Sequence, residues 1–369
     1  MEKVLVKDII AVIEDFAPVG YQESYDNSGL QVGSREDEVK AVLLTLDVTE
    51  AVLDEALSAG ATMIVAHHPL LFSGLKQISG RTYIERIVQK AIKNDITIYA
   101  AHTNLDNVRN GVNAKIAEKL GLINTSILAP MTDKLRKLYT YVPVASVNTV
   151  RDALFAAGTG HIGQYSECSF NAQGTGTFRA SADANPTTGV AGGAREQVEE
   201  VKLEVLIEKH TESKVLKALF TSHPYEEVAY EIIEIQNANQ DLGAGIIGYL
   251  PKPMTEKSFL EHLKQQMKTD CIRYTALSGK NIEKVAICGG SGSFLLKDAI
   301  KAGADVFITG DFKYHQFFDA ENKLVIADIG HYESEQFTVE IFGEVLNKKF
   351  PNFAVLVSKT STNPIKYYT

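Results

Sequence analysis

The sequence has little cysteine. Only three of its 369 residues are cysteines, Cys168, Cys271 and Cys288, and no two of them form a C-x-x-C pair. An odd number at these spacings excludes a disulfide framework and a cysteine zinc site. We therefore expect a reducing, cytoplasmic setting. Any bound metal must then be held by histidine and carboxylate side chains.

An excess of basic residues and a long apolar run are also missing. The chain has 37 Lys+Arg against 46 Asp+Glu, a formal net charge of −9, so nucleic acid is an unlikely partner. No apolar run approaches the roughly 18 residues that span a bilayer, and the charges near the N-terminus do not fit a signal peptide. We expect no membrane partner. Hydrophobic residues at 45% and charged residues at 22% are typical of a globular protein.

Short apolar runs alternate with helical patterns in two stretches of the chain, from the N-terminus to about residue 125 and again from about residue 242. This alternation indicates βαβ units and a parallel sheet. The predicted strands are 41–46, 63–66, 96–101, 285–288, 306–309, 324–327 and 353–357, and the main predicted helices are 5–16, 48–59, 83–93 and 112–120.

The middle of the chain has a different pattern. Its predicted strands and helices, at 138–143, 147–157, 201–208, 213–220 and 228–235, resemble a split βαβ sandwich of the ferredoxin-like kind. The stretch rich in glycine and small residues at 171–194 is predicted to be an ordered hairpin or loop. We predict an α/β unit of two segments, 1–128 and 239–369, interrupted by an inserted α+β domain at 129–238.

Histidines and carboxylates follow three of the predicted strands. A spacing of four residues places a histidine and a carboxylate on one side of a helical turn. Ligands gather at the carboxyl ends of parallel strands, and imidazole and carboxylate suit Zn²⁺, Mn²⁺, Fe²⁺ or Co²⁺. Four or five such ligands are enough for two ions. The residues are His67 and His68, His102 and Asp106, and His331 and Glu335.

Each of these features has a plainer interpretation. A single histidine at a strand end is usually an ordinary hydrogen-bonded residue. Asp311 and His315, again four apart after a strand, are either outer partners of the metal ligands, substrate contacts, or a solvated helix start. The turn at 289–292, Gly-Gly-Ser-Gly, either binds a phosphate through its N–H groups or is simply a tight turn. The absence of a G-x-S-x-G motif gives no support to a serine hydrolase.

Taken together, these motifs resemble the NIF-three-like family, whose members are often named GTP cyclohydrolase 1 type 2 homologues. The matching stretches lie at 26–33 (DNSGLQVG), 66–69 (AHHP), 102–106 (HTNLD), 309–315 (TGDFKYH) and 330–335 (GHYESE). The insert resembles the PII-like or CutA-like domain of the longer bacterial members, through 174–179 and 223–227.

This resemblance implies a dinuclear site between the two α/β segments, with two divalent ions per chain. Zinc is the metal expected, with Mn, Fe or Co as alternatives. Asp106 and Glu335 would bridge the ions, and His102 would be an outer partner that positions Asp106 or a water. The resemblance also implies a homo-oligomer in the form of a hexameric ring. The implied ligands are His67, His68, Asp106, His331 and Glu335.

The resemblance further implies a metal-dependent hydrolase. A metal-bridging hydroxide would open the guanine ring of GTP and release formate, so the substrate would be a small molecule such as a nucleotide. The alternative is a metal-binding regulatory or scaffold protein, not an enzyme, whose PII-like insert senses a small effector.

Overall fold

The computed structural model describes residues 3–368, which divide into two compact units. Unit 1 contains the described residues up to Pro130 and from Asp241 onward, and unit 2 is Met131–Gln240. The insert was predicted at 129–238.

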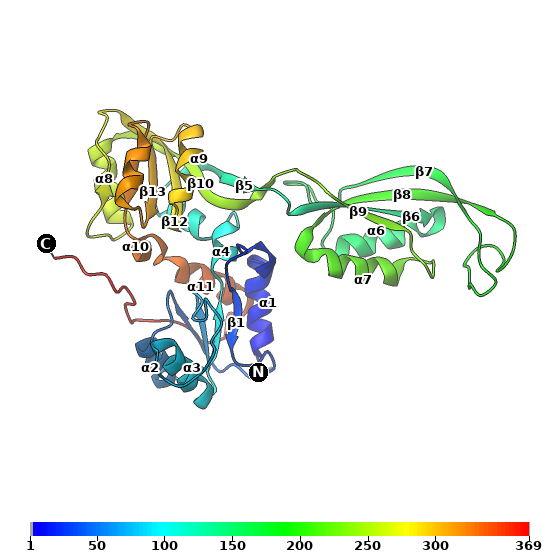
Figure 1. Ribbon diagram of the computed structural model, residues 1–369, viewed down its shortest axis with the longest axis horizontal. Coiled ribbons are helices and arrows are strands. Elements are labelled where there is room, and N and C mark those ends of the chain that lie inside the picture. The colour runs from blue at the N-terminus through cyan, green and yellow to red at the C-terminus, as the bar shows by residue number, and fades with distance from the viewer. Residues whose placement is uncertain (1–2, 369) are drawn as a thin grey trace. The chain divides into compact units, whose positions relative to one another are not determined.

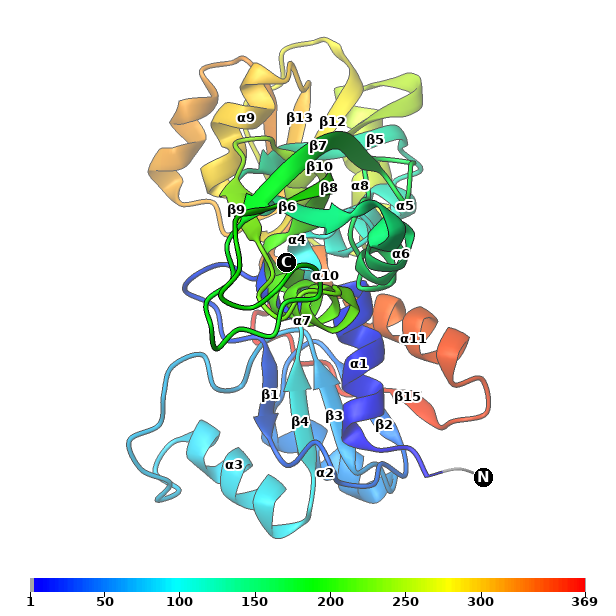
Figure 2. The ribbon, with the colours of Figure 1, turned by 90° about the vertical axis from the view of Figure 1, so that its right-hand side faces the viewer.

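A five-stranded sheet forms one half of unit 1, with the strand order β1-β4-β3-β2-β15. Strands β15, β2, β3 and β4 are parallel, and β1 is antiparallel at the edge. Apolar residues of α2 and α3 pack on one face of this sheet. Figure 2 shows its strands β1, β4, β3 and β2 side by side. The strands are β1 (Gly29–Val32), β2 (Val42–Thr45), β3 (Met63–Ala66), β4 (Thr97–Ala100) and β15 (Val355–Val357). The helices are α1 (Val6–Phe16), α2 (Glu50–Ser58), α3 (Tyr83–Lys93) and α11 (Thr338–Lys349).

A six-stranded sheet forms the other half of unit 1, with the order β11-β14-β13-β12-β10-β5. Strands β12, β13 and β14 are parallel, whereas β10 and β11 are antiparallel to their neighbours. The strands are β5 (Ile123–Met131), β10 (Asn239–Thr255), β11 (Arg273–Tyr274), β12 (Asn281–Ser291), β13 (Val306–Gly310) and β14 (Val325–Asp328). The helices of this half are α5 (Val112–Lys119), α8 (Glu256–Gln266), α9 (Leu296–Lys301) and α10 (His331–Glu335), whereas α4 (Thr103–Asn107) follows β4 of the first sheet.

The two sheets of unit 1 share a topology. In each, three parallel strands follow one another in the chain, and a short strand that precedes them pairs antiparallel with the third, giving β1-β4-β3-β2 and β11-β14-β13-β12. A short helix follows the third parallel strand in both, α4 after β4 and α10 after β14. The fold therefore places a His–x3–carboxylate pair at the same position of each sheet.

Unit 2 is an antiparallel four-stranded sheet with the order β7-β8-β6-β9. Along the chain its elements follow the order βαββαβ, and Figure 1 shows both helices on one face of the sheet. Buried residues such as Leu138, Leu154 and Leu219 form a core between the helices and the sheet. The elements are β6 (Leu135–Pro143), α6 (Val147–Ala156), β7 (Ser169–Phe178), β8 (Glu196–Glu208), α7 (Glu212–Ser222) and β9 (Tyr230–Glu234).

The α/β rhythm of the sequence predicted the parallel strands well, and β2, β3, β4, β12, β13, β14 and β15 all lie where apolar runs were predicted. The stretch at 171–194 contains the end of β7 and the loop to β8, so the predicted hairpin is confirmed. Short 3-10 turns complete the chain at Val19–Tyr21, Val144–Ser146, Lys209–Thr211, Ser293–Leu295 and Tyr314–Ala320. Across residues 3–368, the helices are all too short or too polar to cross a bilayer.

Candidate metal centre

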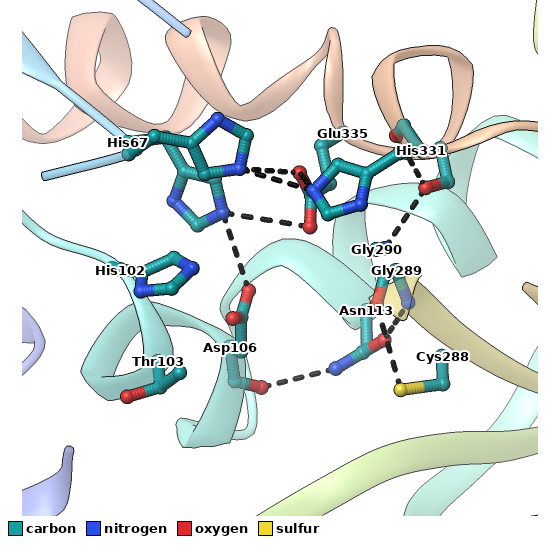
Figure 3. Close-up of polar contacts among 12 residues, drawn as sticks. His67, His102, Thr103, Asp106, Asn113, Cys288, Gly289, Gly290, His331 and Glu335 are labelled. Carbon is teal, nitrogen blue, oxygen red and sulfur yellow. Dashed lines mark hydrogen bonds and ion pairs between the residues drawn. The ribbon is translucent and has the colours of Figure 1, made fainter. Parts of the chain in front are cut away.

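The histidines and carboxylates that follow the parallel strands converge inside unit 1. His67 and His68 directly follow β3, Asp106 lies on α4 after β4, and His331 and Glu335 lie on α10 after β14. Figure 3 shows the Asp106 carboxylate directed at the His67 ring, with Glu335 beside His331. Residues more than 260 positions apart in the chain thus contact one another, as in the hydrogen bond between His68 and Glu335.

One group of donors surrounds the buried Nε2 atom of His67. This nitrogen lies 3.6 Å from Asp106 Oδ1 and 3.7 Å from Glu335 Oε1, both too far for a hydrogen bond. Within residues 3–368, His67 Nε2 and Asp106 Oδ1 are buried and have no hydrogen-bond partner. Buried polar atoms without partners are rare because desolvation is costly. A cation between these atoms would satisfy both of them.

A second group of donors surrounds the other oxygen of Glu335. Glu335 Oε2 lies 2.9 Å from His68 Nε2 and 3.1 Å from His331 Nε2, and the two nitrogens are 3.2 Å apart. Each group could hold a metal ion, since its ligand atoms all lie within 4.8 Å of one another. Glu335 belongs to both groups, with Oε1 facing the first and Oε2 the second.

The Nδ1 atoms of His67 and His68 make the contacts expected of metal ligands. His67 Nδ1 lies 2.8 Å from the Ala101 carbonyl oxygen, which can only accept, so Nδ1 donates and Nε2 is left with its lone pair. His68 Nδ1 donates to Asp47 Oδ1 at 2.7 Å. Metal-ligating histidines usually donate their other ring N–H to a carbonyl or carboxylate in this way.

His102 and His331 are oriented by carboxylates in the same manner. His102 Nδ1 lies 2.8 Å from Asp26 Oδ1, and His331 Nδ1 lies 2.7 Å from Asp311 Oδ2. His102 also forms a third group with His67 and His68 that could hold a metal ion. Its ring centroid is 5.4 Å from the centroids of both those rings. The geometry thus makes His102 available as a donor, whereas the sequence suggested an outer partner.

Opposite charges stabilise this cluster. Burial disfavours the charged form of His68, but hydrogen bonds to Asp47 and Glu335 outweigh it and raise the pKa of His68 to about 10. The same balance, with Glu335 as the main partner, raises the pKa of His331 to about 9. Desolvation and the neighbouring Glu335 carboxylate raise the pKa of Asp106 to about 7. Burial alone would raise the pKa of Glu335, but its hydrogen bond with His331 holds that pKa well below its usual range.

Glycine at position 290 makes room for Glu335. Gly290 is buried with φ +61°, and a Cβ atom there would lie 2.3 Å from Glu335 Oε1. Asn113 connects the same turn to Asp106, because it donates to the Asp106 carbonyl oxygen and accepts from the Gly289 N–H (Figure 3). The glycine turn therefore serves to shape the wall of the donor cluster.

The amide groups of this glycine turn are already used within the protein. Gly289 N donates to Asn113 Oδ1, Gly290 N donates to Ser334 Oγ, and Gly292 N donates to Thr309 Oγ1. The suggestion that the turn binds phosphate through its N–H groups is wrong for these three residues, because no donor is left for a ligand.

Asp311 and His315, two further candidates from the sequence, differ in their contacts with the donor groups. Asp311 contacts His331 through the hydrogen bond to Nδ1. His315 is exposed, and its ring contacts Tyr314 and Phe318. The donor groups found among the described residues do not include His315. Its spacing of four from Asp311 does not form a helical pair, because Asp311 has φ +58° and lies before the 3-10 helix of residues 314–320.

Sequence reasoning missed the roles of Asp26 and Asp47. Asp47 follows β2, and the same argument about strand ends would have found it. Asp26 precedes β1, and no pattern in the sequence shows that it contacts His102, 76 positions away.

Comparisons with known proteins show which family the chain belongs to. The sequence model of the family described as Duf34/NIF3 (NGG1p interacting factor 3) matches residues 4–364. The chain belongs to the Duf34/NIF3 family. A Halalkalibacterium halodurans protein named GTP cyclohydrolase 1 type 2 homolog is 41% identical, over 97% of this chain and 98% of its own. A Bacillus subtilis protein of the same name is 40% identical, over 98% of each chain.

Solved structures of Duf34/NIF3 proteins have the same fold. A crystal structure of a Bacillus cereus protein related to NIF3 superposes with a TM-score of 0.86, at 41% identity and over the whole of both chains. A Staphylococcus aureus protein superposes with a TM-score of 0.78 at 31% identity, again over both whole chains. The predicted fold is therefore confirmed as a mixed α/β fold of the NIF3 kind.

Proposed function

We propose that the chain is a metal-dependent hydrolase with two divalent ions at the donor cluster of unit 1. The observation that carries this proposal is the position of Glu335, whose two oxygens face separate donor groups. The unpartnered His67 Nε2 and Asp106 Oδ1 atoms support a cation in the first group. The proposed ligands are those of the family resemblance: His67, His68, Asp106, His331 and Glu335.

The geometry favours different roles for Asp106 and Glu335 from those that the resemblance implied. Asp106 and Glu335 were both expected to bridge, but only Glu335 is seen to direct one oxygen to each group. We propose Glu335 as the bridge, Asp106 as a ligand of the first ion, and His102 as an additional donor near His67 and His68.

Two divalent ions held by these residues would supply Lewis acidity and would lower the pKa of a bound water, which allows hydrolysis at neutral pH. The residues of the chain orient the site. Asp47, Asp311 and the Ala101 carbonyl fix the rings of His68, His331 and His67 with Nε2 directed inward. Burial of Glu335, whose side chain is 3% exposed, keeps water from competing for its oxygens.

The name of these relatives suggests the reaction to test first, which is opening of the guanine ring of GTP with loss of C8 as formate. Metal content and turnover should be measured on the full chain loaded with zinc, manganese or ferrous ion. We expect about two ions per chain at saturation, and formate release from GTP or a related ring compound.

Variants make this test specific. His67→Ala/His68→Ala should bind fewer than one ion per chain, and Glu335→Gln should abolish turnover. His315→Ala and Glu344→Gln, at exposed positions, are the matched controls and should leave both properties unchanged. Full metal content in the double variant would contradict the proposed ligands. Two bound ions with no turnover of any ring compound would favour the regulatory alternative.

Other expectations from the resemblance stay predictions. These are zinc as the native metal, the hexameric ring and the PII-like or CutA-like nature of unit 2; the cytoplasmic setting, expected from the few cysteines, is a prediction too. The βαββαβ order of unit 2 supports its PII-like or CutA-like nature. Size measurement in solution tests the ring.

A further inference from the structure

A cavity of about 540 Å³ opens beside the donor cluster within unit 1. His68, His102, His331, Asp106 and Glu335 form its floor. A substrate that reaches the metal ligands must occupy this space, so its walls indicate what kind of molecule the site accepts.

The acidic side chains that line the cavity outnumber its histidines, and the described residues of its wall include no long basic side chain. Glu23 and Asp47 join Asp106 and Glu335 in the wall, and the lining residues, all within the described part of the chain, include no lysine or arginine. Lys366 follows the lining residue Ile365, but it is exposed and its Nζ donates to the Asn363 carbonyl oxygen. The wall, in the part of the chain that the structure describes, therefore offers the outer phosphates of a triphosphate no lysine or arginine partner.

The three glycine N–H groups of the turn beside the cavity are not free to bind a phosphate. A glycine-rich turn can bind phosphate through its N–H groups. Here the N–H groups of Gly289, Gly290 and Gly292 donate to Asn113, Ser334 and Thr309. The turn therefore provides a neutral surface beside Ser291.

Aromatic rings form the remaining part of the wall. Tyr25, Phe72 and Phe294 all line the cavity, and they are 64%, 50% and 65% exposed. Tyr25 and Phe72 lie with ring centroids 6.4 Å apart, and Phe72 contacts the edge of His102 at 6.2 Å. Exposed rings at a cavity mouth provide faces on which a flat ligand stacks. Leu46, Pro364 and Ile365 add apolar surface.

We propose that this cavity binds an uncharged planar heteroaromatic ring, such as a nucleobase or a pterin, in preference to a nucleoside triphosphate, with Tyr25, Phe72 and Phe294 as the ring-contacting residues. The proposal rests on the proposed function, because it assigns the part of the substrate that the metal-containing site recognises. It changes the expectation drawn from the relatives' name, since the ring of GTP fits this wall and its phosphates do not.

Binding to the zinc-loaded full chain tests the proposal independently of turnover. Isothermal titration with guanosine, adenosine, pterin, GTP and inorganic triphosphate should show at least one uncharged compound binding about tenfold or more tightly than GTP, and no binding of triphosphate to the cavity. Phe294→Ala and Tyr25→Ala should each weaken binding of that compound about tenfold. Phe318→Ala is the matched control, because Phe318 is 66% exposed but lies outside the cavity lining.

A gain of function gives a second test. Ser291 is exposed and lines the cavity, so Ser291→Lys places an ammonium group in the wall. This variant should bind GTP about tenfold more tightly than the wild type, and wild-type affinity for GTP in Ser291→Lys would contradict the role given to the charge of the wall.

Three results would overturn the proposal: GTP binding more tightly than every uncharged compound in the wild type, no binding of any of the three uncharged compounds at millimolar concentration, or equal affinities for Phe294→Ala and Phe318→Ala. The hydrolase proposal fails separately. Ring binding without turnover supports the present inference and contradicts the hydrolase, whereas efficient turnover of GTP with a KM far below that of guanosine does the reverse.

Discussion

Replacing Gly290 by alanine should prevent metal binding while leaving the fold in place. The new Cβ would lie 2.3 Å from Glu335 Oε1, the oxygen that faces His67 and Asp106. Glu335 must then move away from the position at which it serves both donor groups. Gly303→Ala is a close control, because Gly303 has φ +70° and the methyl group of an alanine there would have no neighbouring atom within 4 Å.

The expected changes in stability follow from the surroundings of Gly290 and Gly303. Forcing alanine into a left-handed conformation costs about 1–2 kcal/mol, and both variants carry this cost. Free metal at 100 times its Kd stabilises a folded protein by about 2.7 kcal/mol per site. Gly303→Ala keeps that gain and Gly290→Ala loses it. In a domain of this size the loss corresponds to roughly 5–10 °C in Tm.

The assay is thermal unfolding of the full chain with zinc and with a chelator, together with metal analysis of each variant. We expect zinc to raise the Tm of the wild type and of Gly303→Ala, but not that of Gly290→Ala. If Gly290→Ala binds the same amount of zinc as Gly303→Ala and gains the same Tm, then Glu335 is not the shared ligand.

Two further predictions concern the partners and the protonation of the cluster. Asp47→Asn removes the carboxylate that accepts a hydrogen bond from His68 Nδ1, so the affinity for zinc, measured by chelator competition, should fall about 10- to 100-fold. The control Asp54→Asn alters an exposed ion pair with Lys90 and should leave the affinity for zinc unchanged. In the chelated protein the pKa values of His68 and His331 are about 10 and about 9, above the ordinary value of 6.5. The stability that these two groups contribute is therefore fully present below pH 6.5 and is lost as the pH rises toward 9–10. Because zinc binds neutral imidazoles, zinc should remove this loss of stability at high pH and should release protons when it binds at pH 7. Unfolding at pH 6 and pH 9 measures the first effect, and calorimetry in two buffers measures the second. An equal pH dependence of stability with and without zinc would contradict this prediction.

The parallel strands of unit 1 were predictable because both faces of such strands are buried. Stretches such as Met63–Ala66 and Val306–Gly310 consist of buried residues only, and an uninterrupted apolar run is a strong local signal. β7 gives no such signal. It is mostly exposed and rich in glycine and threonine, and its pairing with β8 is determined by tertiary contacts.

The candidate site was predictable in its residue types and less so in its arrangement. Strand ends and the spacing of four identified His331 and Glu335 on α10, where His331 Nε2 does lie 3.1 Å from Glu335 Oε2. The same spacing suggested Asp311 and His315, but Asp311 has φ +58° and lies before the 3-10 helix that contains His315, so the two do not share a helical turn. The contact of Glu335 with His67 and His68 depends on how two sheets pack, and no local pattern encodes it.

Anomalous X-ray scattering from crystals of the zinc-loaded protein, recorded on both sides of the zinc absorption edge, tests the central claim most directly. We predict two peaks beside Glu335, one facing His67 and Asp106 and the other facing His68 and His331. A single peak, or peaks that do not contact Glu335, would contradict a dinuclear centre bridged by this residue.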